Sequence, residues 1–364
     1  MTVARRNLLQ AARRHRRSRE PTLTVLFPTV GDAAPEPGEL PDDRLRLMFV
    51  CAHPAIDPTM RSALMLQIVL GLDAARIAAA FVVSADAMTK RLGRAKAKIK
   101  AAGIRFEEPQ PDESAERVAA VLDAIYGCYT LHWGGPDDAA STSLAEEALF
   151  LAELVAAQLP DAAEALGLLA LLLLCEARRP ARIDAAGEFV PLDQQATAAW
   201  DAAAIERANG LLAYAATLGD PGSFQVEAAI QAAHCHRLVS GTTPWPEIVV
   251  LYERLLALHP SIGARIGYAV AVAHATGNAR AGMELLDGIE AKAIEQHQPW
   301  WAARSYLLAG LPGRGAEAAE ACGHALALTS DPVLQRHLRR RLAKLRESSG
   351  HRHSPAVARA RRSD

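Results

Sequence analysis

Between residues 90 and 105 the sequence gathers basic side chains that could bind a polyanion. This stretch contains no Asp or Glu, and its cations are Lys90, Arg91, Arg94, Lys96, Lys98, Lys100 and Arg105. Met88, Leu92, Ala95 and Ile99 recur at three- and four-residue spacing, which predicts one apolar face of a helix with the cations on the remainder. Such a helix can neutralise phosphates while its apolar face holds it to a domain.

The residues before this helix predict how it begins and what precedes it. Ser84 is a suitable N-cap, because its hydroxyl oxygen can accept a hydrogen bond from a free amide of the first turn, and Asp86 suits the positive helix N-terminus. A short helix is expected over residues 73–81, followed by a tight turn at 82–83. Two helices joined in this way predict a helix-turn-helix whose second helix is basic.

DNA is the ligand that this arrangement favours, because a recognition helix turns its amino-terminal side chains toward base edges and its later cations toward phosphates. The residues expected at bases are Asp86, Ala87, Thr89 and Lys90, and those expected at the DNA backbone are Ser84, Arg91, Arg94, Lys96 and Lys98. By spacing alone, a lysine-rich amphipathic helix that merely faces solvent is an almost equally good interpretation. The short helix and turn before it favour DNA.

Two further helices, expected at 42–51 and 58–69 with a break at Gly71, complete this segment. The whole stretch, Asp42–Phe106, resembles region 4 of extracytoplasmic-function sigma factors, in particular the group with a carboxy-terminal helical-repeat extension. The resemblance includes the pairs His53-Pro54, Gly71-Leu72 and Arg91-Leu92. In that family this region binds the minus-35 promoter element through its last helix and touches core RNA polymerase. The resemblance therefore implies a role in bacterial transcription initiation, with promoter DNA and core RNA polymerase as partners.

The first residues resemble much less of a sigma factor. Residues 1–20 are rich in arginine and resemble only the last helix of region 2, the part that grips polymerase and melts the minus-10 element. Residues 21–41 are rich in Pro, Gly and acids, which predicts a flexible linker. We expect either that the start lies too far downstream or that the melting region is lost; in the second case the protein should bind DNA without initiating alone.

The composition predicts an all-α protein of two domains. Half of the residues are hydrophobic, only 5% are aromatic, and the net charge is −1, so any polyanion site must be local. The helix-turn-helix domain is expected at 42–106 and a TPR-like helical-repeat domain at 112–346, with a disordered basic tail at 347–364. Helices in the repeat domain are expected at 248–258, 264–275, 279–289, 300–309 and 316–327. Such stacks usually bind a peptide or protein on their concave side.

The segment Glu176–Trp200 resembles a signature of the same sigma-factor group, although the polar cluster that follows the signature glutamine reads Gln195, Ala196, Thr197 here. A possible interdomain or partner contact lies at its start, at Arg178, Arg179, Arg182 and Asp184. These arginines could clamp a carboxylate from another domain or a partner. An internal network that fixes a loop explains them at least as well. The alternative function for the whole chain is a protein-interaction scaffold in which the helix-turn-helix is vestigial and the helical repeats bind the partner.

Catalytic and metal-binding functions are not favoured. His53 near Cys51, and the His234 and His236 pair around Cys235, lack the spacing of a metal site, and no catalytic set stands out. We expect no enzyme activity, no cofactor and no metal. The scattered cysteines indicate a reducing compartment, and no apolar run is long enough to span a bilayer. The sequence thus predicts a cytoplasmic protein without a membrane partner.

Overall fold

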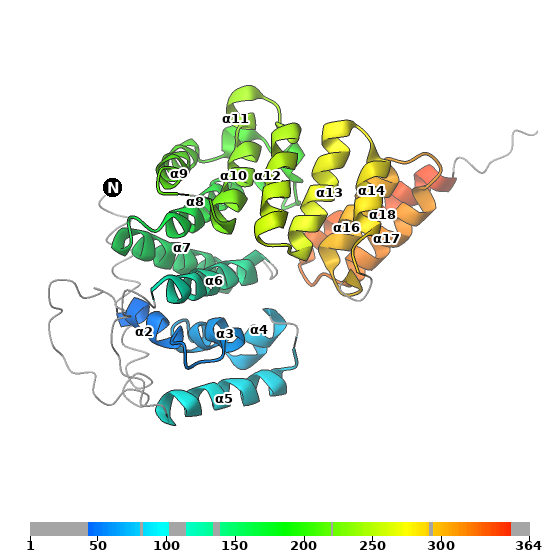
Figure 1. Ribbon diagram of the computed structural model, residues 1–364. Coiled ribbons are helices and arrows are strands. Elements are labelled where there is room, and N and C mark those ends of the chain that lie inside the picture. The colour runs from blue at the N-terminus through cyan, green and yellow to red at the C-terminus, as the bar shows by residue number, and fades with distance from the viewer. Residues whose placement is uncertain are drawn as a thin grey trace, which may run out of the picture. The chain divides into compact units, whose positions relative to one another are not determined.

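The computed structural model describes residues 43–80, 83–101, 114–133, 139–219, 221–290 and 294–350. Within these ranges the regular structure is helical, apart from an isolated antiparallel bridge between Ile183 and Phe189 (Figure 1). The all-α prediction is confirmed. The expected region 2 remnant at 1–20, the linker at 21–41, the domain break at 107–111 and the tail from 351 onward lie outside the described residues.

The chain divides into two compact units, Met1–Leu172 and Leu173–Asp364. The boundary falls inside helix α8 (Ala163–Arg178), an apolar helix whose leucines are buried.

The described helices of the first unit are α2 (Asp43–Cys51), α3 (Pro58–Ile68), α4 (Ala74–Ala80), α5 (Ala85–Ala101), α6 (Ser114–Trp133) and α7 (Ala139–Gln158). Helix α3 packs against α2, α4, α5 and α6, so it is the centre of this unit. Leu45, Leu64 and Ile77 are fully buried between these helices. Burial of each such side chain contributes roughly 1.5–3 kcal/mol, which is why the short helix α4 stays folded.

Local sequence signals set the ends of α3. The Asp57 carboxylate accepts hydrogen bonds from the Thr59 amide (3.0 Å) and hydroxyl (2.8 Å), and these bonds lower the pKa of Asp57. Pro58 follows at the first helical position, where its missing N–H costs nothing. Gly71 ends the segment with a φ of 66°, a left-handed conformation that glycine adopts without strain.

Two ion pairs join α6 and α7 to the helices before them. Arg61 is 4% exposed, and its guanidinium contacts Glu116 of α6 (2.6 Å) and the Ile56 carbonyl (3.1 Å). Arg44 of α2 contacts Glu147 of α7 at 2.7 Å. The helices before and after residues 102–113 therefore belong to one packed unit, an association that the sequence did not predict.

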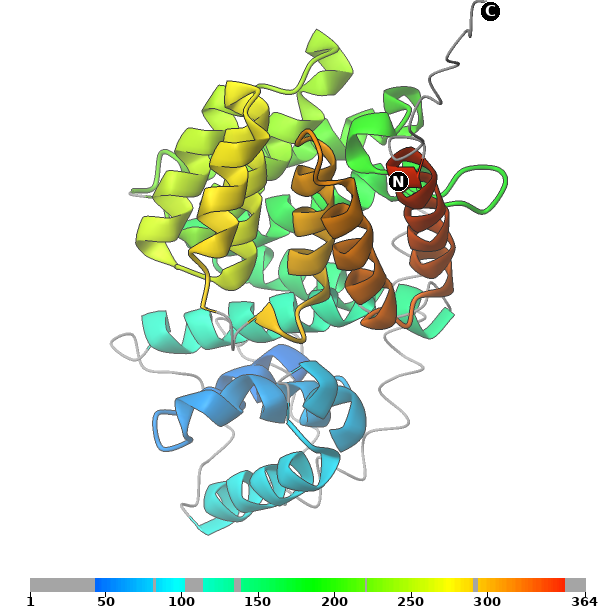
Figure 2. The ribbon, with the colours of Figure 1, turned by 90° about the vertical axis from the view of Figure 1, so that its right-hand side faces the viewer.

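The second unit begins with the end of α8 and continues with α9 (Ala202–Ala215), α10 (Ser223–Cys235), α11 (Arg237–Ser240), α12 (Trp245–Leu258), α13 (Ile262–Thr276), α14 (Ala279–Asp287), α16 (Gln298–Ala309), α17 (Gly315–Ala327) and α18 (Pro332–Gly350). From α12 onward the described helices pack mainly on their neighbours in sequence, as Figure 2 shows. The helices expected in this region are present, with ends shifted by a few residues. Helix α18 extends to Gly350, past the point where a disordered tail was expected to begin.

Close packing of α13, α14 and α16 depends on Gly282. A Cβ atom there would lie 2.7 Å from the Ala269 carbonyl oxygen and 2.9 Å from the Ala273 Cβ, whereas a Cβ at Gly210 of α9 would meet no atom within 4 Å. We expect Gly282→Ala to lower the free energy of unfolding by about 1–3 kcal/mol through overpacking. Gly210→Ala should raise it by up to about 1 kcal/mol, because alanine favours helix. Denaturant unfolding of both variants checks this, and equal effects would contradict it.

Candidate nucleic-acid interface

Helix α5 is held to the first unit by the apolar face that its spacing predicts. Met88, Leu92, Ala95 and Ile99 are between 1% and 8% exposed, so the predicted face is confirmed. They pack against α3 and α4. In both ribbon views α5 lies along the edge of the unit, with its other side facing no helix of that unit (Figures 1 and 2).

The remaining surface of α5 is cationic. Its exposed cations are Lys90, Arg91, Arg94, Lys98 and Lys100, and Lys96 is half-buried. Asp86 is the one acid in the helix. The Arg94 guanidinium lies 3.4 Å from the Lys90 carbonyl oxygen, a long contact that leaves most of its donors free for a ligand. The structure thus brings three of the predicted backbone-contact residues, Arg91, Arg94 and Lys98, onto one exposed side, where they can neutralise a polyanion, whereas Lys96 is half-buried and lies on another side of the helix.

The N-terminal turn of α5 carries the residues predicted to face bases. Asp86 and Thr89 are exposed and Ala87 is half-buried. The Thr89 hydroxyl donates to the Ala85 carbonyl oxygen (2.9 Å), and its oxygen stays able to accept. Ser84 accepts a hydrogen bond from the Ala87 amide at 3.2 Å, as expected of an N-cap, and its own proton remains available to a phosphate oxygen.

Removal of the Ser84 cap should loosen the start of α5. We expect Ser84→Ala to lower the free energy of unfolding by about 1 kcal/mol, because the Ala87 amide loses its acceptor. Ser84→Asp should keep most of that stability, since a carboxylate caps equally well. Urea unfolding of the three proteins checks the order, and a Ser84→Asp variant as unstable as Ser84→Ala would contradict it.

The arginines of the 176–200 segment have partners within the chain. Arg178 is buried, and its guanidinium donates to the Leu174 carbonyl oxygen (3.2 Å) and to the side chain of Gln231. Arg179 pairs with Glu176 at 3.4 Å, and the Arg182 guanidinium lies 5.8 Å from the ring centroid of Phe189.

Asp184 stabilises the turn that follows these arginines. One of its carboxylate oxygens accepts hydrogen bonds from the amides of Ala186 and Glu188, both at 2.9 Å. Gly187 takes a φ of 78° there. Glu188 in turn forms ion pairs with Arg336 and Arg340 of α18. Together with the arginine contacts, this geometry favours a role in fixing the loop.

A cavity of about 310 Å³ in the second unit was not predicted from the sequence. His274 stacks on Trp245 with ring centroids 4.1 Å apart, and its Nε2 lies 3.0 Å from the Tyr306 hydroxyl. Burial, with Arg178 and Arg237 nearby, lowers the pKa of His234 to about 4. The cavity is lined by Pro191, Leu192, Asp193, His234, Arg237, Thr243, Trp245, Val270, His274, Ala302, Ala303 and Tyr306. No local pattern could reveal it, because these residues come from separate helices and a loop.

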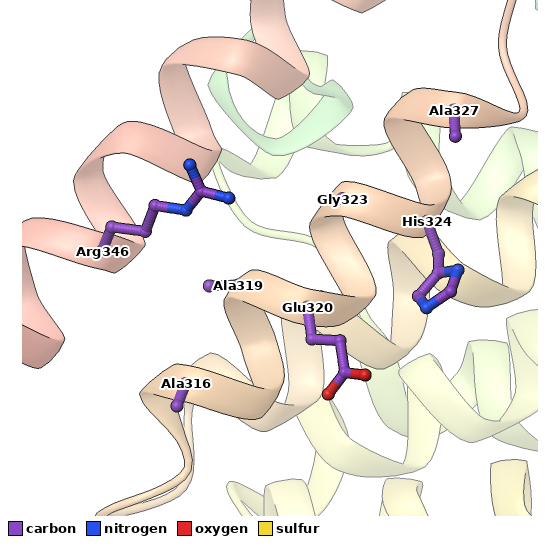
Figure 3. A pocket seen from close by; sticks show the side chains of 7 residues that line it. All are labelled: Ala316, Ala319, Glu320, Gly323, His324, Ala327 and Arg346. Atoms are coloured by element: carbon purple, nitrogen blue, oxygen red, sulfur yellow. The ribbon is translucent and has the colours of Figure 1, made fainter.

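A wider hollow of about 620 Å³ lies beside α17 (Figure 3). Its floor is a row of small residues, Ala316, Ala319, Gly323 and Ala327, and Glu320, His324 and Arg346 border it. In Figure 3 the Arg346 side chain extends from α18 toward α17. His324 is held in place by stacking on Trp301, with ring centroids 4.2 Å apart.

The described residues contain no group of three or more His, Cys, Asp or Glu side chains placed to hold a metal ion. Burial raises the pKa of the Cys51 thiol to about 12, and the nearby His53 ring accepts a hydrogen bond from the Ala55 amide at 3.1 Å. Among the helices that the structure describes, none is both long and apolar enough to cross a membrane.

Comparisons with known proteins give two matches. The family model described as "Family of unknown function (DUF6596)" matches residues 117–216, which run from α6 into the end of α9. The "Uncharacterized protein R00370" of Rhizobium meliloti (strain 1021) is 38% identical over 307 residues, covering 84% of this chain and 72% of R00370. No solved structure matches the chain.

Proposed function

We propose that this chain, which belongs to the same family as protein R00370 of Rhizobium meliloti (strain 1021), is a sigma factor-like transcription protein. It binds the minus-35 element of promoter DNA and core RNA polymerase. The observation that carries the proposal is the exposed cationic side of α5 opposite a face buried on α3 and α4. The resemblance of residues 42–106 to region 4 of sigma factors is the reason for proposing promoter DNA as the ligand of this surface.

In this proposal α4 and α5 are the two helices of a helix-turn-helix. Helix α5 spans 17 residues, about 25 Å at 1.5 Å per residue, which is long enough to lie in a major groove. Asp86 and Lys90 are then nearest the base edges, while Arg91, Arg94 and Lys98 neutralise phosphates along the backbone.

The second unit is a TPR-like regulatory domain in this proposal. Helices that pack on their sequence neighbours build a stack whose surface can hold a peptide or protein. The cavity beside Trp245, His274 and Tyr306 offers rings and hydrogen-bonding groups to one side chain of such a partner.

The same cavity favours a second candidate function, a protein-interaction scaffold whose helix-turn-helix no longer binds DNA. The two functions differ in their first measurable step. A sigma factor-like protein binds core polymerase and a promoter duplex, whereas a scaffold binds neither.

The test measures binding of the chain to core RNA polymerase and to a duplex from the promoter of its own operon, followed by in-vitro transcription. A version extended upstream in frame is assayed beside it. Binding to both partners with strong salt dependence of the DNA step supports the proposal. If neither form binds core polymerase or the duplex, the proposal fails and the scaffold takes its place.

A further inference from the structure

We propose that α18 forms a second nucleic-acid surface that contacts phosphates without reading sequence. This surface consists of Arg336, Arg339, Arg340, Lys344 and Arg346. It lies on the second unit and is separate in the chain from α5. It extends the proposed function, and the experiment below separates the failure of one from the failure of the other.

The apolar side of α18 is already used in folding. Leu338 is 4% exposed and packs with Cys322 and Ala325 of α17, and Leu334, Leu342 and Leu345 pack around the same cluster. A basic helix that binds a membrane needs a free apolar face, and α18 has none to offer. The helix therefore presents charge alone to a ligand.

The other side of α18 carries five of the six Lys and Arg residues of this helix, which form a cationic arc. At 100° per residue the five cations fall within about half of the helix circumference. Between them lies Ala343, a side chain too small to anchor a protein interface, where aromatic and large apolar residues dominate. Glu347 is the one acid in the helix; it is exposed and lies among these cations, so the five cations outnumber it on this side. An extended polyanion suits this surface better than a folded protein.

Some side chains of the arc are already held in position by contacts within the protein before any ligand binds. Arg336 and Arg340 pair with Glu188, which fixes them against the 184–188 turn. Arg339 contacts the Gln335 side chain at 3.1 Å. Within the described part of the chain, Arg339, Lys344 and Arg346 make no ion pair.

The reach of the surface fits a phosphate backbone. From Arg336 to Arg346 the helix rises about 15 Å, enough to face successive phosphates of one strand. Arg346 stands at the hollow beside α17, so its guanidinium is accessible from that side as well (Figure 3).

The test uses the full chain and a fluorescent duplex of scrambled sequence. Replacement of Arg339, Lys344 and Arg346 by glutamine should lower the slope of log affinity against log salt by about 2.7, at about 0.9 per lost phosphate contact. The matched control replaces Arg254, Arg265 and Arg280, three exposed arginines of the same unit, so that the net charge changes equally. The control should keep the wild-type slope.

The inference depends on how the slopes of the α18 variant and the control compare. Equal slopes in the α18 variant and the control overturn the inference, because general charge would then explain the binding. Wild-type binding to vesicles of anionic lipid but not to the duplex overturns it in favour of a membrane. A variant with Arg91, Arg94 and Lys98 replaced by glutamine, assayed on the promoter duplex, separates the two sites. Loss on the scrambled duplex in the α18 variant supports this surface, whereas wild-type promoter binding by the α5 variant sinks the proposed function.

Discussion

Replacement of Arg91, Arg94 and Lys98 by glutamine is expected to weaken binding to the promoter duplex by at least about tenfold at 50 mM salt. The three side chains lie exposed on α5. Because each phosphate contact releases counterions from the DNA, a variant that loses three contacts releases fewer counterions when it binds. The slope of log affinity against log salt should fall by about 2.7. Between about 50 and 200 mM salt, the wild-type affinity should then drop about 40-fold more than that of the variant.

The control for this prediction is again the triple variant of Arg254, Arg265 and Arg280, which removes the same charge elsewhere. Fluorescence anisotropy over a salt series gives both slopes. The folded state is checked by circular dichroism, and no loss of stability is expected, because exposed substitutions usually change it by less than about 0.5 kcal/mol. An unchanged slope in a folded α5 variant would remove α5 as the DNA-binding element.

The largest loss of stability is expected for Leu92→Ala. Leu92 is 2% exposed on the face of α5 that packs against α3 and α4, so its truncation leaves a cavity in the first unit. Comparable Leu→Ala changes cost about 2–5 kcal/mol. Lys100→Ala, an exposed change on the same helix, should alter the free energy of unfolding by less than about 0.5 kcal/mol.

Denaturant unfolding measures both variants, and hydrogen exchange of the α5 amides shows where Leu92→Ala acts. Protection should fall first in α5, since Leu92 is central among the side chains that hold it. A variant with wild-type protection in α5 and wild-type unfolding would show that the packing of this face contributes little.

Much of the α5 site could be predicted from the sequence, because it depends on short-range rules. The spacing of Met88, Leu92 and Ile99 sets the buried face through the 3.6-residue period, and the hydroxyl of Ser84 meets an amide only three residues away. The cations fall on the exposed side by the same geometry. Their ligand does not follow from spacing, and the proposal of promoter DNA rests on the resemblance to sigma factors.

The contacts between distant segments could not be predicted in the same way. Arg178 was considered as a clamp for a partner, but its guanidinium is buried against Leu174 and Gln231, which lies more than fifty residues away in the chain. The Arg237 guanidinium donates to the carbonyl oxygens of Asp193 and Gln195. Backbone carbonyl acceptors cannot be identified from a sequence, since every residue has one.

The sequence by itself determined the helical class, the positions of α2 to α5 and of the described helices from α12 to α17, and the two-sided character of α5, because these follow from side-chain periodicity and capping. The tertiary structure alone decided that α6 packs on α3, that the compact units divide inside α8, and that Trp245, His274 and Tyr306 line one cavity. The physical reason is range: a helix depends on neighbours within four residues, whereas packing partners are selected by shape and burial across the whole chain.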